Sequence, residues 1–174
     1  MSPLRLAIAA LAVPGVLAVL PAAAQAPNPL DNVPEKMPFD VPYGEPIALE
    51  KAQALVNAAV AEAKKHDWKM NVAVVDSGAN LVAFGRMDGA QLASISIAEH
   101  KARSAAKYRR ETKAFENGIQ QAGMHYLATL DDVVASRGGI PLVQGGKLVG
   151  AIGCSGGTGS QDEVACKAAL AALQ

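Results

Sequence analysis

Apolar residues recur at helical spacing between residues 49 and 65, and the pattern predicts the first helix of the chain. The stripe consists of Ala52, Leu55, Val56, Ala59, Val60 and Ala63. Polar residues fill the positions between them, as on a helix with one face against a core. The Val-rich run 71–76 then has the character of a buried strand, residues 77–80 suit a turn, and residues 81–84 form the returning strand. These three segments predict an antiparallel hairpin.

The second half of the chain is predicted to contain a second hairpin with helices before and after it. A helix is predicted over residues 92–107, and the mixed pattern of residues 108–132 favours a helix with irregular pieces. Strands are predicted at 140–143 and 148–154, on either side of a turn whose glycines accept the positive φ angles that tight hairpins need. A last helix follows and extends to about residue 173.

The start of this last helix carries a capping signal. Ser160 and Glu163 have the spacing of a capping box, in which each side chain bonds the free backbone N–H of the other residue. The order of elements is helix, hairpin, helix, mixed segment, hairpin and helix. Because hairpins pair antiparallel strands, we predict a single domain of the α/β (α+β) class, with an antiparallel sheet packed by helices.

The first residues have the layout of a secretory signal peptide. A short basic start, residues 1–5, precedes the apolar run 6–20, and small residues follow at Ala22 and Ala24. The apolar run is shorter than the roughly 20 residues that a membrane-spanning helix needs, and no later apolar segment is long enough to span a membrane. We therefore predict a signal peptide over 1–24 and export to the periplasm or the medium. An uncleaved amphiphilic anchor is the alternative.

Proline marks the segment after the predicted cleavage site. Six of the ten prolines fall here, at Pro27, Pro29, Pro34, Pro38, Pro42 and Pro46. Proline lacks a backbone N–H and restricts the residue before it to extended conformations. Residues 25–46 are therefore predicted to form an extended arm, either a flexible linker or a segment that lies along a neighbouring subunit. The folded domain is expected to comprise residues 47–174.

Composition narrows the class of protein further. The 16 basic residues balance 16 acidic residues, which argues against a nucleic-acid-binding protein, since such proteins usually carry a basic excess. Aromatic residues are only 4 % of the chain, so the core must be built from alanine, valine, leucine and isoleucine. Cys154 and Cys166 would meet an oxidising compartment after export. We favour two buried small side chains over a disulfide between them.

Few side chains offer obvious chemistry. Arg86 and Asp88 flank a loop, where they either pair with each other or bind an anionic ligand. Asp76 ends a strand and is expected to bond its own turn. His100 and His125 can each donate one axial ligand to a haem iron, whereas the spacing of the histidines does not support a structural zinc site.

Five blocks of sequence stand out in order along the chain. They are VAVVDSGANLVAF, RMDGA, SISIAEHKARSAA, GGIPL and GAIGCSGGTGSQDEVACKAALAAL. Together they resemble the GlcG/HbpS family of haem-binding and haem-degrading-domain proteins, over roughly residues 47–173. The resemblance implies a GlcG/HbpS-like (profilin-like) single domain and homo-oligomeric assembly, and it links exported members to haem binding and oxidative-stress sensing. Characteristic family glycines fall on Gly138 and Gly139, which are candidate ligand-binding residues on this resemblance. Thr112 matches a threonine that looks like a haem-contacting position, with Glu111 where relatives often have proline.

The resemblance and the residues together predict an exported protein that binds haem or a similar tetrapyrrole, in haem handling or oxidative-stress sensing. Haem is expected to dock against residues 107–126. The basic groups for its propionates are Lys107, Arg109 and Arg110. The candidate iron ligands are Thr112, His125 and His100.

Two other functions stay open from the sequence. One is an enzyme that acts on a small organic acid or aldehyde with Arg86 as its anchor, although no nucleophile–base pair is visible. The other is a non-catalytic sensor or accessory protein. In each case we expect a homo-oligomer, because the small residues of the second helix, between Ala93 and Ala105, would let two helices approach closely.

Overall fold

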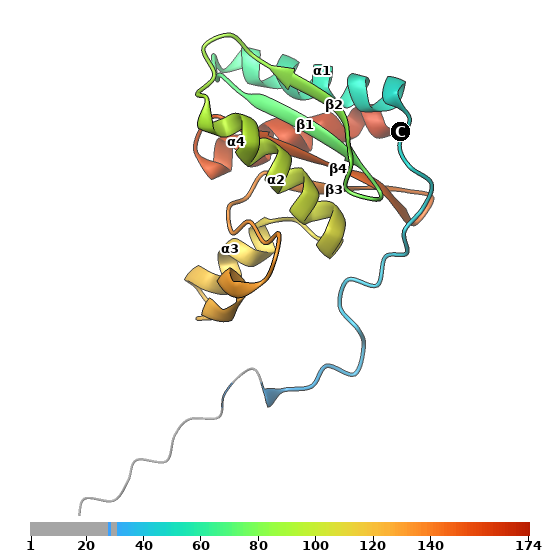
Figure 1. The fold of residues 1–174 in the computed structure, drawn as a ribbon, viewed down its shortest axis with the longest axis vertical. Helices are drawn as coiled ribbons and strands as arrows, with labels where there is room; N and C mark the ends of the chain where they lie inside the picture. Colours follow the sequence, from blue (N-terminus) through green and yellow to red (C-terminus); the bar gives the residue numbers. More distant parts are fainter. Residues whose placement is uncertain (1–27, 29–30) are drawn as a thin grey trace, which may run out of the picture. The chain divides into compact units, whose positions relative to one another are not determined.

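The computed structural model describes residue 28 and residues 31–174, and residues 36–174 form the second of two units of the chain. The predicted signal peptide, residues 1–24, lies outside the described residues. The second unit carries the helices and strands that are described below (Figure 1).

A four-stranded antiparallel sheet forms the centre of the second unit (Figure 1). Its strands are β1 (Asn71–Asp76), β2 (Leu81–Arg86), β3 (Gly139–Gln144) and β4 (Lys147–Ser155). The order across the sheet is β2-β1-β4-β3, so the two predicted hairpins lie side by side and β1 pairs with β4 at the centre. Every pairing between these four strands is antiparallel, which confirms the predicted fold class.

Helices cover both faces of this sheet (Figure 1). They are α1 (Leu49–Lys65), α2 (Ala93–Tyr108), α3 (Lys113–Gln120), α4 (Gly159–Ala168) and the 3-10 helices η2 (His125–Thr129) and η3 (Ala169–Leu173). One face packs against α1, α4 and η3, and the other face packs against α2. Helices α3 and η2 follow α2 in the sequence and pack against each other. In the described part of the chain, no helix has the combined length and apolar character that crossing a bilayer requires.

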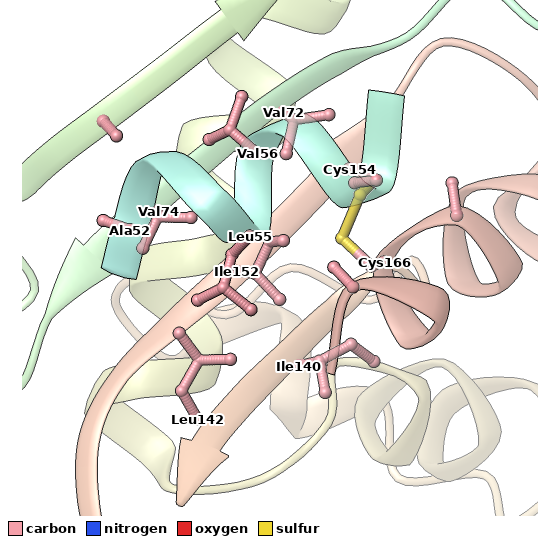
Figure 2. Packing of buried hydrophobic residues seen from close by; sticks show 14 of the residues in the cluster. Ala52, Leu55, Val56, Val72, Val74, Ile140, Leu142, Ile152, Cys154 and Cys166 are labelled. Atoms are coloured by element: carbon pink, nitrogen blue, oxygen red, sulfur yellow. A yellow bond between two sulfur atoms is a disulfide. The ribbon is translucent and has the colours of Figure 1, made fainter. Parts of the chain in front are cut away.

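Alternate residues of the strands enter two separate apolar clusters. In the larger cluster, Val72, Val74 and Ile152 of the sheet pack with Leu55 and Val56 of α1 (Figure 2). The cluster on the other face consists of Ala73, Val75, Ala79, Ala98, Ala102, Ala105, Ala106, Leu148 and Ala151. The alanine stripe of α2 is thus buried against its own sheet. The prediction that this stripe lets two subunits approach is therefore wrong.

The predicted bounds of α1 and β1 agree with the structure, but the cap of the last helix does not. Helix α4 begins at Gly159, and its N-cap is Thr158. The hydroxyl of Thr158 accepts the N–H of Gln161 at 3.4 Å, and the side chain of Gln161 accepts the N–H of Thr158 at 2.8 Å. The capping box predicted at Ser160 and Glu163 is therefore wrong. Thr158 is the last extended residue, and Ser160 already lies inside the helix.

Cys154 of β4 and Cys166 of α4 form a disulfide (Figure 2). Their Cα atoms are 5.7 Å apart, within the range that a disulfide spans. Both residues are buried in the larger apolar cluster. The prediction of two unpaired cysteines is wrong, because α4 folds back over the strand that precedes it and brings the two side chains together.

The last part of the Pro-rich arm lies on the folded unit of its own chain. The N–H of Gly44 donates to the carbonyl of Leu148 at 2.7 Å, and the N–H of Leu148 donates to the carbonyl of Pro42 at 2.8 Å. The hydroxyl of Tyr43 donates to the carbonyl of Lys107 at 2.8 Å. These bonds hold the arm against β4 and α2, an arrangement that neither sequence-based alternative described.

Candidate functional site

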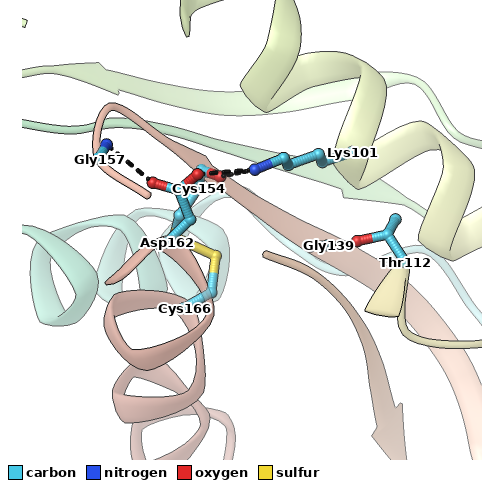
Figure 3. Close-up of a disulfide and its surroundings, with 7 residues drawn as sticks. All are labelled: Lys101, Thr112, Gly139, Cys154, Gly157, Asp162 and Cys166. Atoms are coloured by element: carbon cyan, nitrogen blue, oxygen red, sulfur yellow. Dashed lines mark hydrogen bonds and ion pairs between the residues drawn. A yellow bond between two sulfur atoms is a disulfide. The ribbon is translucent and has the colours of Figure 1, made fainter. Parts of the chain in front are cut away.

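A buried ion pair joins α2 to the first turn of α4 (Figure 3). The Nζ of Lys101 lies 2.7 Å from Oδ2 of Asp162 and also donates to the carbonyl of Cys154 at 3.2 Å. The Oδ1 of Asp162 accepts the N–H of Gly157 at 3.0 Å. Burial raises the pKa of the Asp162 carboxyl, and the charge of Lys101 opposes that shift. The pair fixes how α2 and α4 meet and offers no charge to a ligand in solvent.

Thr112 is the residue immediately before α3 (Figure 3). Its hydroxyl donates to the carbonyl of Ser136 at 2.7 Å and accepts the N–H of Gly139 at 2.9 Å. A Cβ on Gly139 would lie 2.6 Å from Cγ2 of Thr112, so this close approach requires glycine. Gly138 adopts a φ of 115°, which glycine alone adopts readily. In this arrangement Thr112 and the two glycines hold the loop before β3, and the hydroxyl is enclosed.

The predicted basic residues at the end of α2 lie together, beside the arm. Lys107 pairs with Asp132 at 2.5 Å. Arg109 donates to the carbonyl of Val41 at 3.0 Å, and its guanidinium lies 5.5 Å from the centre of the Tyr43 ring. The arm therefore contacts the surface where the sequence predicts the propionates of a haem.

Arg110 has an aromatic environment. Its guanidinium carbon lies 3.5 Å from the centre of the Phe39 ring and 5.3 Å from that of Phe115, and its Nε donates to the carbonyl of Tyr108 at 3.3 Å. Within the described residues, neither Arg109 nor Arg110 has a carboxylate partner. Partial burial lowers the pKa of the Arg110 guanidinium. A bound anion would compensate this partly desolvated charge.

A cavity of about 430 Å³ opens beside Arg110. Its lining residues are Phe39, Arg110, Glu111, Lys113, Ala114 and Asn117. The cavity thus combines apolar surface from Phe39 and Ala114 with two cations and the carboxylate of Glu111. Lys113 also pairs with Glu163 at 3.1 Å, and Glu111 pairs with Lys167 at 3.1 Å. Such a lining suits a flat apolar molecule that carries carboxylates.

The two candidate histidines lie on different elements. His100 of α2 lines a separate cavity of about 280 Å³ with Asp132, Val133 and Val134. His125 is the first residue of η2, and both histidines are exposed. Among residues 31–174, no group of three or more histidines, cysteines or carboxylates is arranged to hold a metal ion.

Arg86 and Asp88 lie at the β2 edge of the sheet, and β3 forms the other edge. Both line a cavity of about 400 Å³ between β2 and α1. In the described part of the chain no ion pair joins them, so the alternative in which they bind a ligand stays a prediction. Asp76, by contrast, accepts the N–H of Gly78 at 2.8 Å and that of Asn80 at 2.9 Å, which confirms its role in the turn.

The sequence analysis did not predict the buried ion pair of Lys101, although the position of this lysine on its helix indicates one. Lysine is almost never fully buried without a partner, and Lys101 occurs between the buried residues Ala98 and Ala102 of α2. Its position on the buried face of the predicted helix could have indicated a carboxylate partner. The identity of that partner, Asp162, had no local signal.

A second missed feature is the charged cluster around Glu163. Its carboxylate accepts hydrogen bonds from Lys113 at 3.1 Å and from Lys167 at 2.7 Å, and it lies 3.5 Å from Arg137. Arg137 in turn pairs with Glu116 at 2.6 Å. These residues come from α3, α4 and the loop before β3, so only the folded chain brings them together.

Comparison with known proteins shows what the chain is similar to. The family model described as haem degrading protein HbpS-like matches residues 47–171. Protein GlcG of Escherichia coli (strain K12) is 39 % identical over 109 residues, which are 63 % of this chain and 81 % of that protein.

Two solved structures share the fold. A double mutant of HbpS from Streptomyces reticuli has a TM-score of 0.70 and 28 % identity, over 88 % of this chain and 99 % of that chain. A complex of PduOC with haem has a TM-score of 0.66 and 28 % identity, over 73 % of this chain and 94 % of that chain.

Proposed function

This chain belongs to the family of HbpS-like haem-degrading proteins, and on that premise we propose that it is an exported protein that binds haem or a similar tetrapyrrole. Its role lies in haem handling or oxidative-stress sensing. The similar structure of PduOC was solved as a haem complex, which supports binding within this fold.

The observation that carries the proposal is the environment of Arg110. A guanidinium without a carboxylate partner in the described residues stacks on Phe39 and lines the cavity of about 430 Å³. Guanidinium groups bind carboxylates through two parallel hydrogen bonds, so Arg110 suits a haem propionate. Arg109 offers a second such group, whereas Lys107 is already paired with Asp132.

The apolar part of the same cavity suits the face of a tetrapyrrole ring. Phe39 is 38 % exposed, so its ring is available for contact as well as for stacking on Arg110. Burial of apolar surface there stabilises a complex by about 25 cal/mol per Å². Because Phe39 belongs to the arm, we propose that the arm forms part of the haem site.

We propose that His125 is the residue that would hold the haem iron. It begins η2, which packs against α3, and residues of α3 line the cavity beside Arg110. His100 lines a different cavity, and Thr112 is fully buried with its hydroxyl bonded to two backbone groups. Haem, when bound, supplies the redox chemistry of its iron, while the chain positions it and controls access.

Titration of haemin, followed through the Soret band, tests this site. Arg110→Gln should weaken haemin binding about fivefold, the loss expected of a partly exposed ion pair worth about 1 kcal/mol. Arg103→Gln is the matched control, because Arg103 pairs with Glu99 on α2 and does not line the cavity beside Arg110. His125→Ala should change the Soret spectrum and His100→Ala should not. Absence of saturable binding by the wild type, or unchanged affinity in Arg110→Gln, would contradict the proposal.

Export is proposed from the N-terminal sequence pattern. The disulfide of Cys154 and Cys166 supports it, since disulfides form and persist in oxidising compartments. Mass spectrometry of the periplasmic fraction should find an N-terminus close to Gln25. An intact Met1 in a cytoplasmic product would contradict export.

A homo-oligomer is proposed from family membership and from exposed apolar side chains. Leu49 of α1 is 63 % exposed, and Leu92, just before α2, is 71 % exposed. Light scattering at micromolar concentration should give a mass above that of one chain. A monomer mass would overturn this part of the proposal.

A further inference from the structure

The cavity between α1 and β2 shares no lining residue with the cavity beside Arg110. Its lining residues are Gln53, Val56, Asn57, Val60, Lys64, Lys69, Gly85, Arg86, Met87 and Asp88. Its volume of about 400 Å³ lies in the range of small-molecule sites. We propose that this cavity binds a small organic monocarboxylate with an apolar chain. The inference does not depend on haem binding.

Two unpaired cations define the charged part of this cavity. Arg86 ends β2 and Lys64 lies in the last turn of α1, so the two charges come from different elements. Within the described residues neither has an ion-pair partner, whereas the neighbouring Lys65 pairs with Glu62 at 2.6 Å. A carboxylate can take two hydrogen bonds from Arg86 and a third charge-assisted bond from Lys64.

The remaining polar groups of the lining also favour a bound carboxylate. The Nε2 of Gln53 donates to Oδ1 of Asn57 at 3.2 Å, which leaves the amide N–H groups of Asn57 as further donors. Lys69 pairs with the exposed Asp67, so its charge is partly compensated already. The uncompensated positive charge of the cavity is therefore small and centred on Arg86 and Lys64.

The apolar part of the cavity is built into the packing of α1 on β2. Val56 is 2 % exposed, and a Cβ on Gly85 would lie 2.6 Å from its Cγ1, so glycine allows the strand to approach the helix. Met87 is held by Met70, whose carbonyl accepts the N–H of Met87 at 3.0 Å. The N–H of Met70 donates to Sδ of Met87 at 3.4 Å. This wall is thus preformed, and an alkyl chain of a ligand can lie against the half-buried side chains of Val60 and Met87.

Asp88 selects the charge of the ligand. Its carboxylate lines the same cavity and has no ion-pair partner in the described part of the chain. A second negative charge on a ligand would meet this carboxylate, so a monocarboxylate is favoured over a phosphate dianion.

Calorimetric titrations with sodium hexanoate, sodium acetate and inorganic phosphate test the inference on the full protein at low salt. Hexanoate should bind saturably, and acetate and phosphate should bind at least about tenfold more weakly, since acetate lacks the chain and phosphate carries the second charge. Arg86→Gln and Lys64→Gln should each weaken hexanoate binding at least about fivefold. Lys65→Gln, which removes the neighbouring lysine that does not line the cavity, should leave it unchanged.

Three outcomes would overturn the inference: no saturable hexanoate binding, phosphate binding as tight as that of hexanoate, or unchanged binding in Arg86→Gln with an unchanged melting temperature. Cross-titrations separate this site from the proposed haem site. Hexanoate binding should be unchanged in Arg110→Gln, and haemin binding should be unchanged in Arg86→Gln. Either site can therefore fail its test while the other stands.

Discussion

Lys101 and Asp162 form an ion pair of 2.7 Å in which the two side chains are only 1 % and 3 % exposed. Removal of one partner leaves the other charge buried without compensation, so Lys101→Met and Asp162→Leu should each lower the free energy of unfolding by about 3–5 kcal/mol. The double variant leaves no charge behind and should recover much of that loss. Urea unfolding measures all three variants.

The matched control for this pair is Arg103→Met on the same helix. Arg103 pairs with Glu99 at 3.0 Å near the surface, and such pairs contribute about 1 kcal/mol or less. A double variant as unstable as the sum of the single variants would show that the buried charges are not the cause of the loss.

The stability of the fold should also depend on the charge of Glu116. Hydrogen bonds from the Arg137 side chain lower the pKa of this carboxyl below its usual value of 4.5. A carboxyl with a lowered pKa in the folded state stabilises the fold above pH 4.5, and this stabilisation is lost as the pH falls through the folded-state pKa. Melting temperatures of the wild type and Glu116→Gln between pH 7 and pH 3 measure the effect.

The expected result is a wild type that is more stable than Glu116→Gln near neutral pH, with a difference that shrinks below pH 4.5. Asp162 titrates in both proteins, and burial raises its pKa, so its contribution cancels in the difference. A difference that stays constant down to pH 3 would contradict the assignment to the Glu116 charge.

The sequence predicted those parts of the fold that depend on local pattern. The apolar stripe of residues 49–65 and the Val-rich run 71–76 gave the bounds of α1 and β1, because helix and strand periods are properties of neighbouring residues. The disulfide between Cys154 and Cys166 was harder to predict, since it depends on how far α4 folds back over β4.

The candidate site was predicted less well than the fold. The cluster of Lys107, Arg109 and Arg110 was expected from their adjacency, but the docking of Phe39 on Arg110 joins residues that α1, β1, β2 and α2 separate in the sequence. Proline indicates extended backbone and says nothing about which surface that backbone contacts. The same limit applies to the cavity of Arg86, whose opposite wall comes from α1.

The disulfide should stabilise the fold by restricting the unfolded chain. Cys154 and Cys166 are 12 residues apart, and closing a loop of this length is worth about 3 kcal/mol in the chain-entropy model. The variant Cys154→Ala/Cys166→Ala should lose about this free energy of unfolding in urea. Reductant should lower the stability of the wild type and leave that of the double variant unchanged. Two thiols that react with an alkylating reagent in the unfolded, unreduced wild type would rule out the disulfide.

The hydroxyl of Thr112 should stabilise the loop before β3 and should not ligate iron. It donates to the carbonyl of Ser136 and accepts the N–H of Gly139, and Thr112 is fully buried. Thr112→Val keeps the shape of the side chain but leaves both backbone groups without a partner, so it should cost on the order of 1–3 kcal/mol. Thr112→Ser retains the hydroxyl and is the matched control. Thermal unfolding of the three proteins measures the cost.

The Soret spectrum separates this structural role from a role as ligand. At a temperature where Thr112→Val is folded, its haemin complex should have the wild-type Soret maximum and affinity, because the hydroxyl faces backbone groups of its own chain. A shifted maximum in Thr112→Val, with an unshifted one in Thr112→Ser, would show instead that this oxygen reaches the iron. The proposed role of His125 in holding the iron would then be wrong, and the loop before β3 would have to open when haem binds.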